Sequence, residues 1–190
     1  MQVVIADAGP LIGLARINHL ALLRSLFPTV WITNVIAGEL GGAAQSVGHQ
    51  PYPGSEALQL ALTEGWLVIA PAGTEANDPY RPLNPGVAAG EASAIDLALK
   101  QQAAGQQVLL LVDDRCGRAE ARRQGLSIIG TAAVLLLAKE RALVPACAPL
   151  LKALREQGYY LSDALVAAVL NQAHDRHPDG AGSRPGLSDH

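Results

Sequence analysis

The stretch over residues 108–124, VLLLVDDRCGRAEARRQ, constrains the fold of this chain most strongly. Its first five residues are apolar without alternation, which predicts a strand buried on both faces, as in parallel sheets. Asp113 and Asp114 follow at once. The carboxyl ends of the strands form the ligand crevice in open α/β sheets, so two carboxylates there are placed for chemistry. An aspartate that caps the next helix explains the same residues, and for this pair alone both interpretations stay open.

A basic helix is predicted directly after the two aspartates, ended by Gly125. It carries Arg115, Arg118 and Arg122. We expect these arginines to form a surface for phosphates, because Lys and Arg neutralise phosphates in nucleic-acid complexes. A solvated helix face accounts for them equally well, and the sequence does not separate the two interpretations.

Composition limits the classes of protein to consider. The chain has 190 residues, 49% of them hydrophobic and 16% charged, which fits one domain with a sizeable core. A formal net charge of −3 argues against a broadly basic RNA-coating protein, and one Phe, four Tyr and two Trp are few for base stacking. Two cysteines, no leader segment and no long apolar run predict a cytoplasmic location and no membrane contact.

Apolar segments that alternate with helical patterns predict an α/β fold with a sheet of about five mostly parallel strands, covered by helices on both faces. The expected strands cover residues 2–6, 30–32, 66–70, 108–112 and 127–129. Further helices are expected over 150–157 and 163–173, as a C-terminal extension. Gly- and Pro-rich loops are expected over 41–54 and 71–89.

The predicted domain covers residues 1–173, and residues 174–190 form a polar tail without a core of its own.

Carboxylates recur near the expected strand ends at four places: Asp7, Glu39, Glu91 and the pair Asp113-Asp114. All of them can reach one edge of a parallel sheet. Each alone has a simpler explanation, such as a helix cap or a charge that complements a helix dipole. Together they would repel one another and raise their pKa values, and a cation would relieve that repulsion. Oxygen ligands without His or Cys favour Mg²⁺ or Mn²⁺.

Four segments of the chain resemble the PIN-domain family: VVIADAGPLIGLARINHLALL, NVIAGEL, GEASAIDLAL and VLLLVDDRCGRAEARRQGLSIIGTAAVLLLAKERALVP. The resemblance runs in order over roughly residues 2–172. More narrowly, the chain is similar to the PIN-like bacterial and archaeal subfamily related to VapC-type toxins. The resemblance implies a three-layer fold with a five-stranded parallel sheet and a metal-dependent ribonuclease site.

The resemblance assigns the catalytic acids to four positions: Asp7, Glu39, Glu91 and Asp114. Three of them, Asp7, Glu91 and Asp114, are implied to bind Mg²⁺ or Mn²⁺. Asp113 and Thr131 are implied to support the site, and Thr131 is also expected to cap the helix that follows it. The expected partners are RNA, an antitoxin protein and a second copy of the chain in a homodimer.

Three other functions fit parts of the sequence. Ala8-Gly9 stands where many PIN domains have hydroxyl residues, which favours a catalytically silent module that binds nucleic acid or protein. A receiver-type phosphoacceptor would explain paired aspartates at a strand end, yet it needs a Lys after a final strand, and Lys139 falls in an expected helix. A small-molecule phosphohydrolase would need a nucleophile motif, which the sequence lacks.

Overall fold

Five strands form a single parallel sheet in the computed structural model, which describes residues 2–45, 53–71 and 80–175, with the backbone alone for 42–45. The strands are β1 (Gln2–Ala6), β2 (Val30–Ile32), β3 (Leu67–Ile69), β4 (Gln107–Leu111) and β5 (Ser127–Ile129). Their order is β3-β2-β1-β4-β5, and every neighbouring pair is parallel. The predicted fold class is therefore confirmed, and the sheet is wholly rather than mostly parallel.

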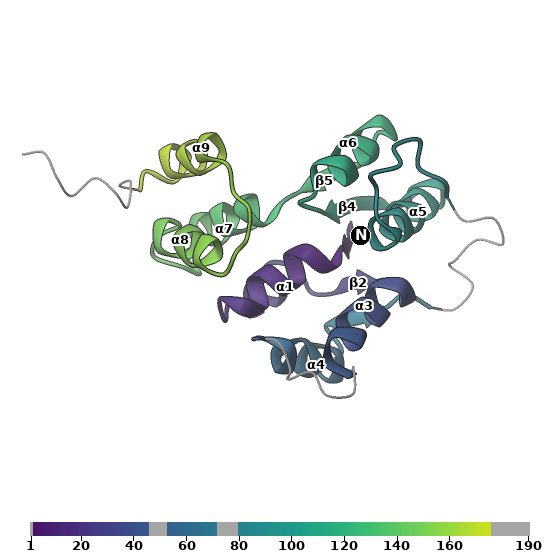
Figure 1. Cartoon of the computed structure of the whole chain (residues 1–190), viewed down its shortest axis with the longest axis horizontal. Coiled ribbons are helices and arrows are strands. Elements are labelled where there is room, and N and C mark those ends of the chain that lie inside the picture. Colours follow the sequence, from purple (N-terminus) through teal and green to yellow (C-terminus); the bar gives the residue numbers. More distant parts are fainter. Residues whose placement is uncertain (1, 46–52, 72–79, 176–190) are drawn as a thin grey trace, which may run out of the picture.

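Helices cover both sides of this sheet. They are α1 (Ala8–Arg16), α2 (Ala21–Leu26), α3 (Asn34–Gln45), α4 (Ser55–Thr63), α5 (Ala89–Ala103), α6 (Arg115–Arg123), α7 (Thr131–Glu140), α8 (Ala148–Glu156) and α9 (Asp163–Ala173). Figure 1 shows α1 and α5 on opposite sides of the sheet, with α7, α8 and α9 grouped beyond α1. Helix α5 packs on β1 and β4, α6 packs on β5, and α1 contacts α7 and α8.

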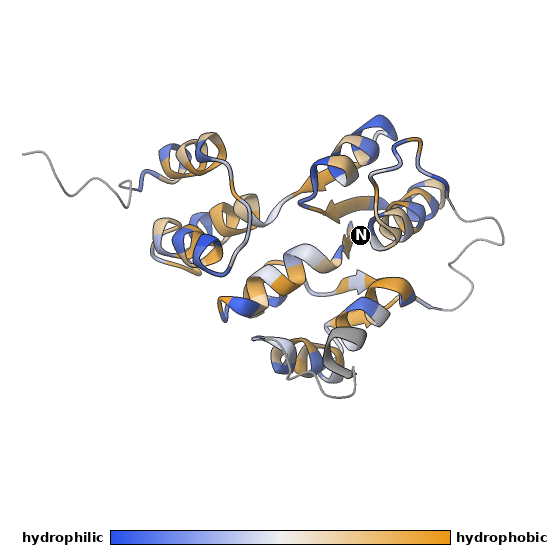
Figure 2. Cartoon of the chain, viewed as in Figure 1, coloured by the Kyte–Doolittle hydropathy of each residue, from blue (hydrophilic) through white to orange (hydrophobic). Residues whose placement is uncertain are grey.

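The two central strands form the middle of the hydrophobic core. Val4 and Ile5 of β1, and Leu110 and Leu111 of β4, are almost completely buried. Figure 2 shows the strands as hydrophobic, whereas the helices mix hydrophobic and hydrophilic residues. Burial of one such side chain contributes about 1.5–3 kcal/mol, which explains why uninterrupted apolar runs locate these strands in the sequence. Within the described residues, no helix has the length and apolar character needed to cross a membrane.

Two local predictions are wrong. Helix α3 runs to Gln45, although a loop was expected from Gly41. Buried Ile36 and Leu40 hold this helix in place, and their burial outweighs the cost of about 1 kcal/mol for a glycine within it. Thr131 is the first residue of α7 rather than its cap, a position that Gly130 takes. Residues 46–52 and 72–79 of the two expected loops lie outside the described residues.

Asp175 belongs structurally to the folded part of the chain. Its carboxylate accepts hydrogen bonds from the backbone N–H groups of Cys147 and Ala148 and pairs with Lys139 of α7. The packed structure thus extends at least two residues past the predicted boundary at residue 173. The rest of the expected tail, residues 176–190, lies outside the described residues.

The sheet order places the ends of β1 and β4 side by side. After β1 the chain moves to β2 on one side, and β4 occupies the other, so the strand order reverses between β1 and β4. Ala6 pairs with Leu111 at the end of the ladder, and the N–H of Asp7 donates to the carbonyl of Leu111 over 2.9 Å. Ligands bind to open α/β sheets at such a reversal. Asp7, Asp113 and Asp114 therefore leave the sheet at the position most suited to a ligand.

Candidate functional site

Asp7 and Asp114 each cap a helix at this edge. Asp7 accepts the N–H of Gly9 over 3.3 Å at the start of α1. Asp114 accepts the N–H groups of Cys116, over 2.6 Å, and of Gly117, over 3.1 Å, at the start of α6. The two interpretations of these aspartates are therefore compatible, because each one caps a helix and also lies at the edge of the sheet where ligands bind. The amino ends of α1 and α6 also bring positive partial charge to the site.

Glu91 reaches the same site from the first turn of α5. Its Oε2 accepts the N–H of Ala88 over 3.0 Å, and the residue is only 7% exposed. The carboxyl group lies against Gly117 of α6, where a Cβ would come within 3.1 Å of the Glu91 Cδ. A glycine at this position lets α5 and α6 approach closely enough for Glu91 to lie beside Asp114.

Glu39 lies at the side of the site. The residue is exposed on α3, and its carboxylate rests on Gly90, where a Cβ would lie 2.6 Å from Oε1. Its charge acts on both Asp7 and Glu91, since it raises the pKa of each. Glu39 is thus near the other acids without lining the cavity they share.

Asp113 is fully engaged in a hydrogen-bonded cluster. It accepts the backbone N–H of Thr131 over 3.0 Å, the hydroxyl of Thr131 over 2.6 Å and the hydroxyl of Tyr159. Thr131 is completely buried. The cluster joins the end of β4 to α7 and to the segment between α8 and α9, which fits the supporting role predicted for Asp113 and Thr131.

The ring of Tyr159 packs on α1 at Gly13. A Cβ at Gly13 would lie 2.6 Å from Cε2 of the Tyr159 ring, so only glycine leaves room for the ring. We expect Gly13→Ala to lower the free energy of unfolding by about 1–3 kcal/mol, because a steric overlap in a packed region outweighs the gain of about 1 kcal/mol in helix propensity. Urea denaturation measures this change. Gly38→Ala is the matched control, since a Cβ there meets no atom within 4 Å, and a stabilised Gly13→Ala protein would contradict the prediction.

One cavity of about 730 Å³ opens in front of these acids. Asp7, Glu91, Asp113 and Asp114 line one part of it, together with Arg115 and Arg118. The remaining lining residues are Gly9, Gly130, Ala132, Ala133, Tyr159, Tyr160, Leu161, Ser162 and Leu165. The volume falls within the range of small-molecule and cofactor sites.

The predicted arginines differ in position. Arg115 and Arg118 line the cavity, whereas Arg122 is exposed one turn further along α6 and does not line it. Arg118 donates from Nη1 to the carbonyl oxygen of Val112 over 3.0 Å, which holds its guanidinium at the end of β4. Arg115 is exposed, and among the described residues it has no ion-pair partner.

Two acids of the site, Asp7 and Glu91, have strongly raised pKa values. Burial raises the pKa of Asp7 to about 6, with repulsion from Glu39 and Asp113 added, although the N–H groups of Ala8 and Gly9 act against it. Burial likewise raises the pKa of Glu91 to about 7, helped by repulsion from neighbouring carboxylates, of which Asp114 acts most strongly. These two carboxyl groups therefore ionise at a higher pH than free Asp and Glu side chains do.

The chemistry of these donors fits a divalent cation. None of Asp7, Glu39, Glu91 and Asp114 forms a salt bridge within the described part of the chain. As the side chains stand, no three His, Cys, Asp or Glu residues among those described are arranged to hold a metal ion. The oxygens of Asp7, Glu91 and Asp114 instead accept backbone N–H groups. A cation would offset the repulsion that raises the pKa values of Asp7 and Glu91.

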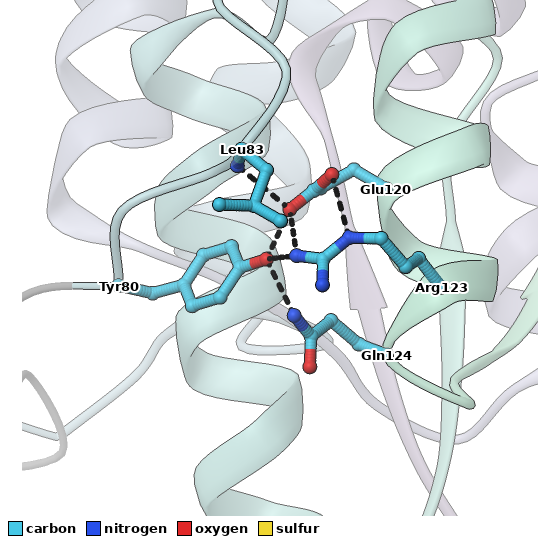
Figure 3. A network of polar contacts seen from close by, with 5 residues as sticks. All are labelled: Tyr80, Leu83, Glu120, Arg123 and Gln124. Carbon is cyan, nitrogen blue, oxygen red and sulfur yellow. Dashed lines mark hydrogen bonds and ion pairs between the residues drawn. The ribbon is translucent and has the colours of Figure 1, made fainter.

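The segment that leads to Glu91 is fastened to α6 by a second polar cluster (Figure 3). Glu120 is 3% exposed, accepts the hydroxyl of Tyr80 and the N–H of Leu83, and forms an ion pair of 2.6 Å with Arg123. The Tyr80 hydroxyl also accepts from Arg123 over 2.9 Å and from Gln124 over 2.7 Å. The cluster fixes residues 80–83 on α6, and a few residues later Ala88 binds Glu91.

Loss of the Glu120 charge should loosen this attachment. Hydrogen bonds from Arg123, and after it Tyr80, lower the pKa of Glu120 from 4.5 to about 2. The ionised carboxylate therefore stabilises the folded state fully above pH 4.5, and this stabilisation is lost as the pH falls toward 2. We expect Glu120→Gln to lower the free energy of unfolding at pH 7 by about 1–3 kcal/mol. Urea denaturation at pH 7 and pH 3 should show a smaller difference at pH 3.

Glu156→Gln is the matched control. Glu156 pairs with Lys152 over 3.8 Å with both side chains more than 60% exposed, and its loss should cost less than about 1 kcal/mol. Equal effects of the two substitutions would contradict the role given to Glu120.

Tyr159 and Tyr160 are site residues that the sequence analysis did not identify. Both line the cavity, on the segment between α8 and α9. A usable signal was present, because two adjacent tyrosines stand in a short polar connection of a chain with only four tyrosines. The contact of Tyr159 with Asp113 joins residues 46 positions apart, and no local pattern indicates it.

The sheet is parallel, and acidic side chains and helix amino ends lie where its strand order reverses. These features define an α/β protein with a ligand site at the carboxyl ends of its strands. The chain belongs to the PIN-domain family: the family model DUF3368, described as a PIN domain, matches residues 3–175. The predicted family is thus confirmed. PIN domains are generally nucleases and typically use divalent metal ions, which supports a hydrolase of the nuclease type. A search of curated proteins found no match to the chain.

Proposed function

We propose that this protein is a metal-dependent endoribonuclease that hydrolyses phosphodiester bonds of RNA. The observation that carries the proposal is the shared cavity, which is lined by Asp7, Glu91 and Asp114. None of the three forms a salt bridge among the described residues. Asp7, Glu91 and Asp114 would hold Mg²⁺ or Mn²⁺, and Glu39 would add negative charge beside them. Such an ion would supply Lewis-acid activation of water and neutralise charge that develops on the phosphate.

The other residues of the site would act on the substrate and on the acids. Arg115 and Arg118 border the cavity and would attract the phosphate backbone, and Arg122 would extend this basic surface along α6. Asp113, with Thr131 and Tyr159, would keep the end of β4 fixed, so that Asp114 stays in place. The amino ends of α1 and α6 would stabilise negative charge in the cavity.

Cleavage of a diverse RNA pool tests this proposal. We expect cleavage with millimolar Mg²⁺ or Mn²⁺ and none with EDTA, and most generic substrates should be cut slowly. Sequencing of the product ends would show whether cuts are internal and recur at one sequence or structure. An activity that persists in EDTA would overturn the metal dependence.

A silent binding module is the second candidate. Ala8 and Gly9 place no hydroxyl beside Asp7, although a Cβ at Gly9 would lie 3.5 Å from the Asp7 Oδ2 and so leave room for a larger residue. Salt-sensitive RNA binding without any cleavage by the wild type would favour this candidate over the nuclease.

We further propose, on the family resemblance, that the chain is the toxin of a toxin–antitoxin pair and acts as a cytoplasmic homodimer. Both cysteines are free in the structure, which suits a reducing compartment. Induced expression in a bacterial host should arrest growth for the wild type and not for Asp114→Asn, and growth unaffected by the wild type would overturn the toxin role.

A further inference from the structure

We propose that the segment between α8 and α9, residues 157–162, forms a subsite for one unpaired nucleobase of single-stranded RNA, stacked on the ring of Tyr160. The inference rests on the proposed function, because it treats the cavity as the place where an RNA strand lies. It adds a side-chain contact to a base, which the acids and arginines of the site do not supply.

The acids and the segment between α8 and α9 line the same cavity. Residues from the ends of β1 and β4 line one part of it, and Tyr159, Tyr160, Leu161, Ser162 and Leu165 line another. Arg115 and Arg118 border the same cavity. We infer that a nucleotide whose phosphate lies near the arginines would place its base against the apolar and aromatic residues of the same cavity.

The backbone of the segment turns Tyr160 outward. Tyr159 is half-buried and Leu161 is buried, while Tyr160 and Ser162 between and after them are exposed. This alternation is that of an extended chain, in which successive side chains point to opposite sides. Tyr160 is 89% exposed, and its hydroxyl makes no hydrogen bond to another residue that the structure describes. Its ring faces are free to stack.

The segment is held at a fixed place relative to the acids. The Tyr159 hydroxyl donates to Asp113, the neighbour of Asp114, and the Tyr159 ring rests on Gly13 of α1. On the other side, the Ser162 hydroxyl accepts the N–H of Leu165 and starts α9. Tyr160 lies between two anchored residues, so a base stacked on it would keep a constant position with respect to the carboxylates.

The chemistry of this part of the cavity favours a base over a phosphate or a polar ligand. Aromatic side chains bind bases through stacking, which tolerates any sequence because every base has a π-face. Leu165, 42% exposed, adds an apolar surface nearby. Negative charge from the acids would repel a phosphate placed deeper in the cavity, whereas a neutral base meets no such repulsion. Bases in a duplex are already stacked on one another, so the subsite fits single strands.

Fluorescence anisotropy with a labelled single-stranded RNA of mixed sequence tests the subsite, with EDTA present so that no cleavage occurs. Tyr160→Ala should weaken binding about 5- to 150-fold, the range for loss of one stacked base. Tyr160→Phe keeps the ring and should restore the affinity. Leu83→Ala is the matched control, since Leu83 is exposed but lies outside the cavity. A duplex of the same sequence should bind equally to wild type and Tyr160→Ala.

The outcomes separate this inference from the proposed nuclease. If wild type cuts RNA and Tyr160→Ala raises KM with kcat retained, the subsite is supported, and an unchanged KM and affinity would overturn it. If wild type binds single strands through Tyr160 but cuts none of them with Mg²⁺ or Mn²⁺, the nuclease fails and the subsite stands. If Tyr160→Ala dissociates a dimer in sedimentation analysis without any loss of RNA affinity, Tyr160 contacts a second copy and the inference is wrong.

Discussion

Asp7→Asn and Asp114→Asn are each expected to lower RNA cleavage by more than about 100-fold. Each substitution removes one negative charge from the group of oxygens that would hold the metal ion. Changes to residues that only support metal ligands typically cost 10–100-fold in metal affinity or activity, so loss of a ligand charge should cost more. RNA affinity should stay the same or rise, because an anionic substrate then meets less repulsion in the cavity.

The structure indicates that these two substitutions change the charge of the site without disturbing the fold. Asp7 and Asp114 each cap a helix through a carboxylate oxygen, and asparagine caps helices as well as aspartate does. A folding defect is therefore not expected, and thermal unfolding of each variant would verify this. Asp163→Asn is the matched control, because the Asp163 side chain is 98% exposed and lies outside the cavity. Initial cleavage rates on one RNA substrate should fall for the first two variants alone. Undiminished cleavage by both would contradict the site.

The sequence predicts the sheet well because strands buried on both faces have an unmistakable pattern. The bounds of β1, β2 and β5 are those expected from the apolar runs. The expectation that Asp7 and Asp114 lie together follows from the same pattern, since parallel strands carry their carboxyl ends to one edge. The structure brings these residues into one cavity, and their catalytic roles stay predictions.

Contacts between distant segments account for what the sequence did not predict. Nothing near Glu120 in the chain indicates that Tyr80 and Leu83, about forty positions away, satisfy its carboxylate. The sequence predicts Thr131 as a helix cap because Ser and Thr often occupy that position. In the structure its hydroxyl donates to Asp113 instead, and Gly130 is the cap residue. The small number of aromatic residues suggested that the protein does not bind bases by stacking. The position of these residues matters more than their number, because two of the four tyrosines line the cavity.

The metal-free protein is expected to lose stability as the pH rises from 4 to 8. In the folded state the pKa of Asp7 is about 6 and that of Glu91 about 7, against 3.8 and 4.5 for the free side chains. The folded state thus binds more protons than the unfolded state between these values, so the free energy of unfolding falls with rising pH through this window. Each pKa unit corresponds to about 1.4 kcal/mol, which gives roughly 3 kcal/mol for each group taken alone.

Glu91→Gln should remove a large part of this loss and, with it, the response to metal. Glutamine can still accept the N–H of Ala88 through its carbonyl oxygen, but it carries no charge for Asp7, Glu39 or Asp114 to repel. At pH 8 without metal the variant should therefore be more stable than the wild type by about 2–3 kcal/mol.

Addition of Mg²⁺ or Mn²⁺ should reverse the order of the two proteins. An ion that binds only the folded state stabilises it by about 4.1 kcal/mol at a concentration one thousand times its Kd, and the wild type alone would gain this fully. This gain exceeds the advantage of about 2–3 kcal/mol expected for Glu91→Gln without metal. Urea denaturation at pH 5 and pH 8, with and without metal, measures the four free energies of unfolding for each protein. Glu64 is an exposed acid that pairs with Arg24 and does not line the cavity, so Glu64→Gln should behave as the wild type does. A wild-type stability indifferent to both pH and metal would contradict a cation site at these carboxylates.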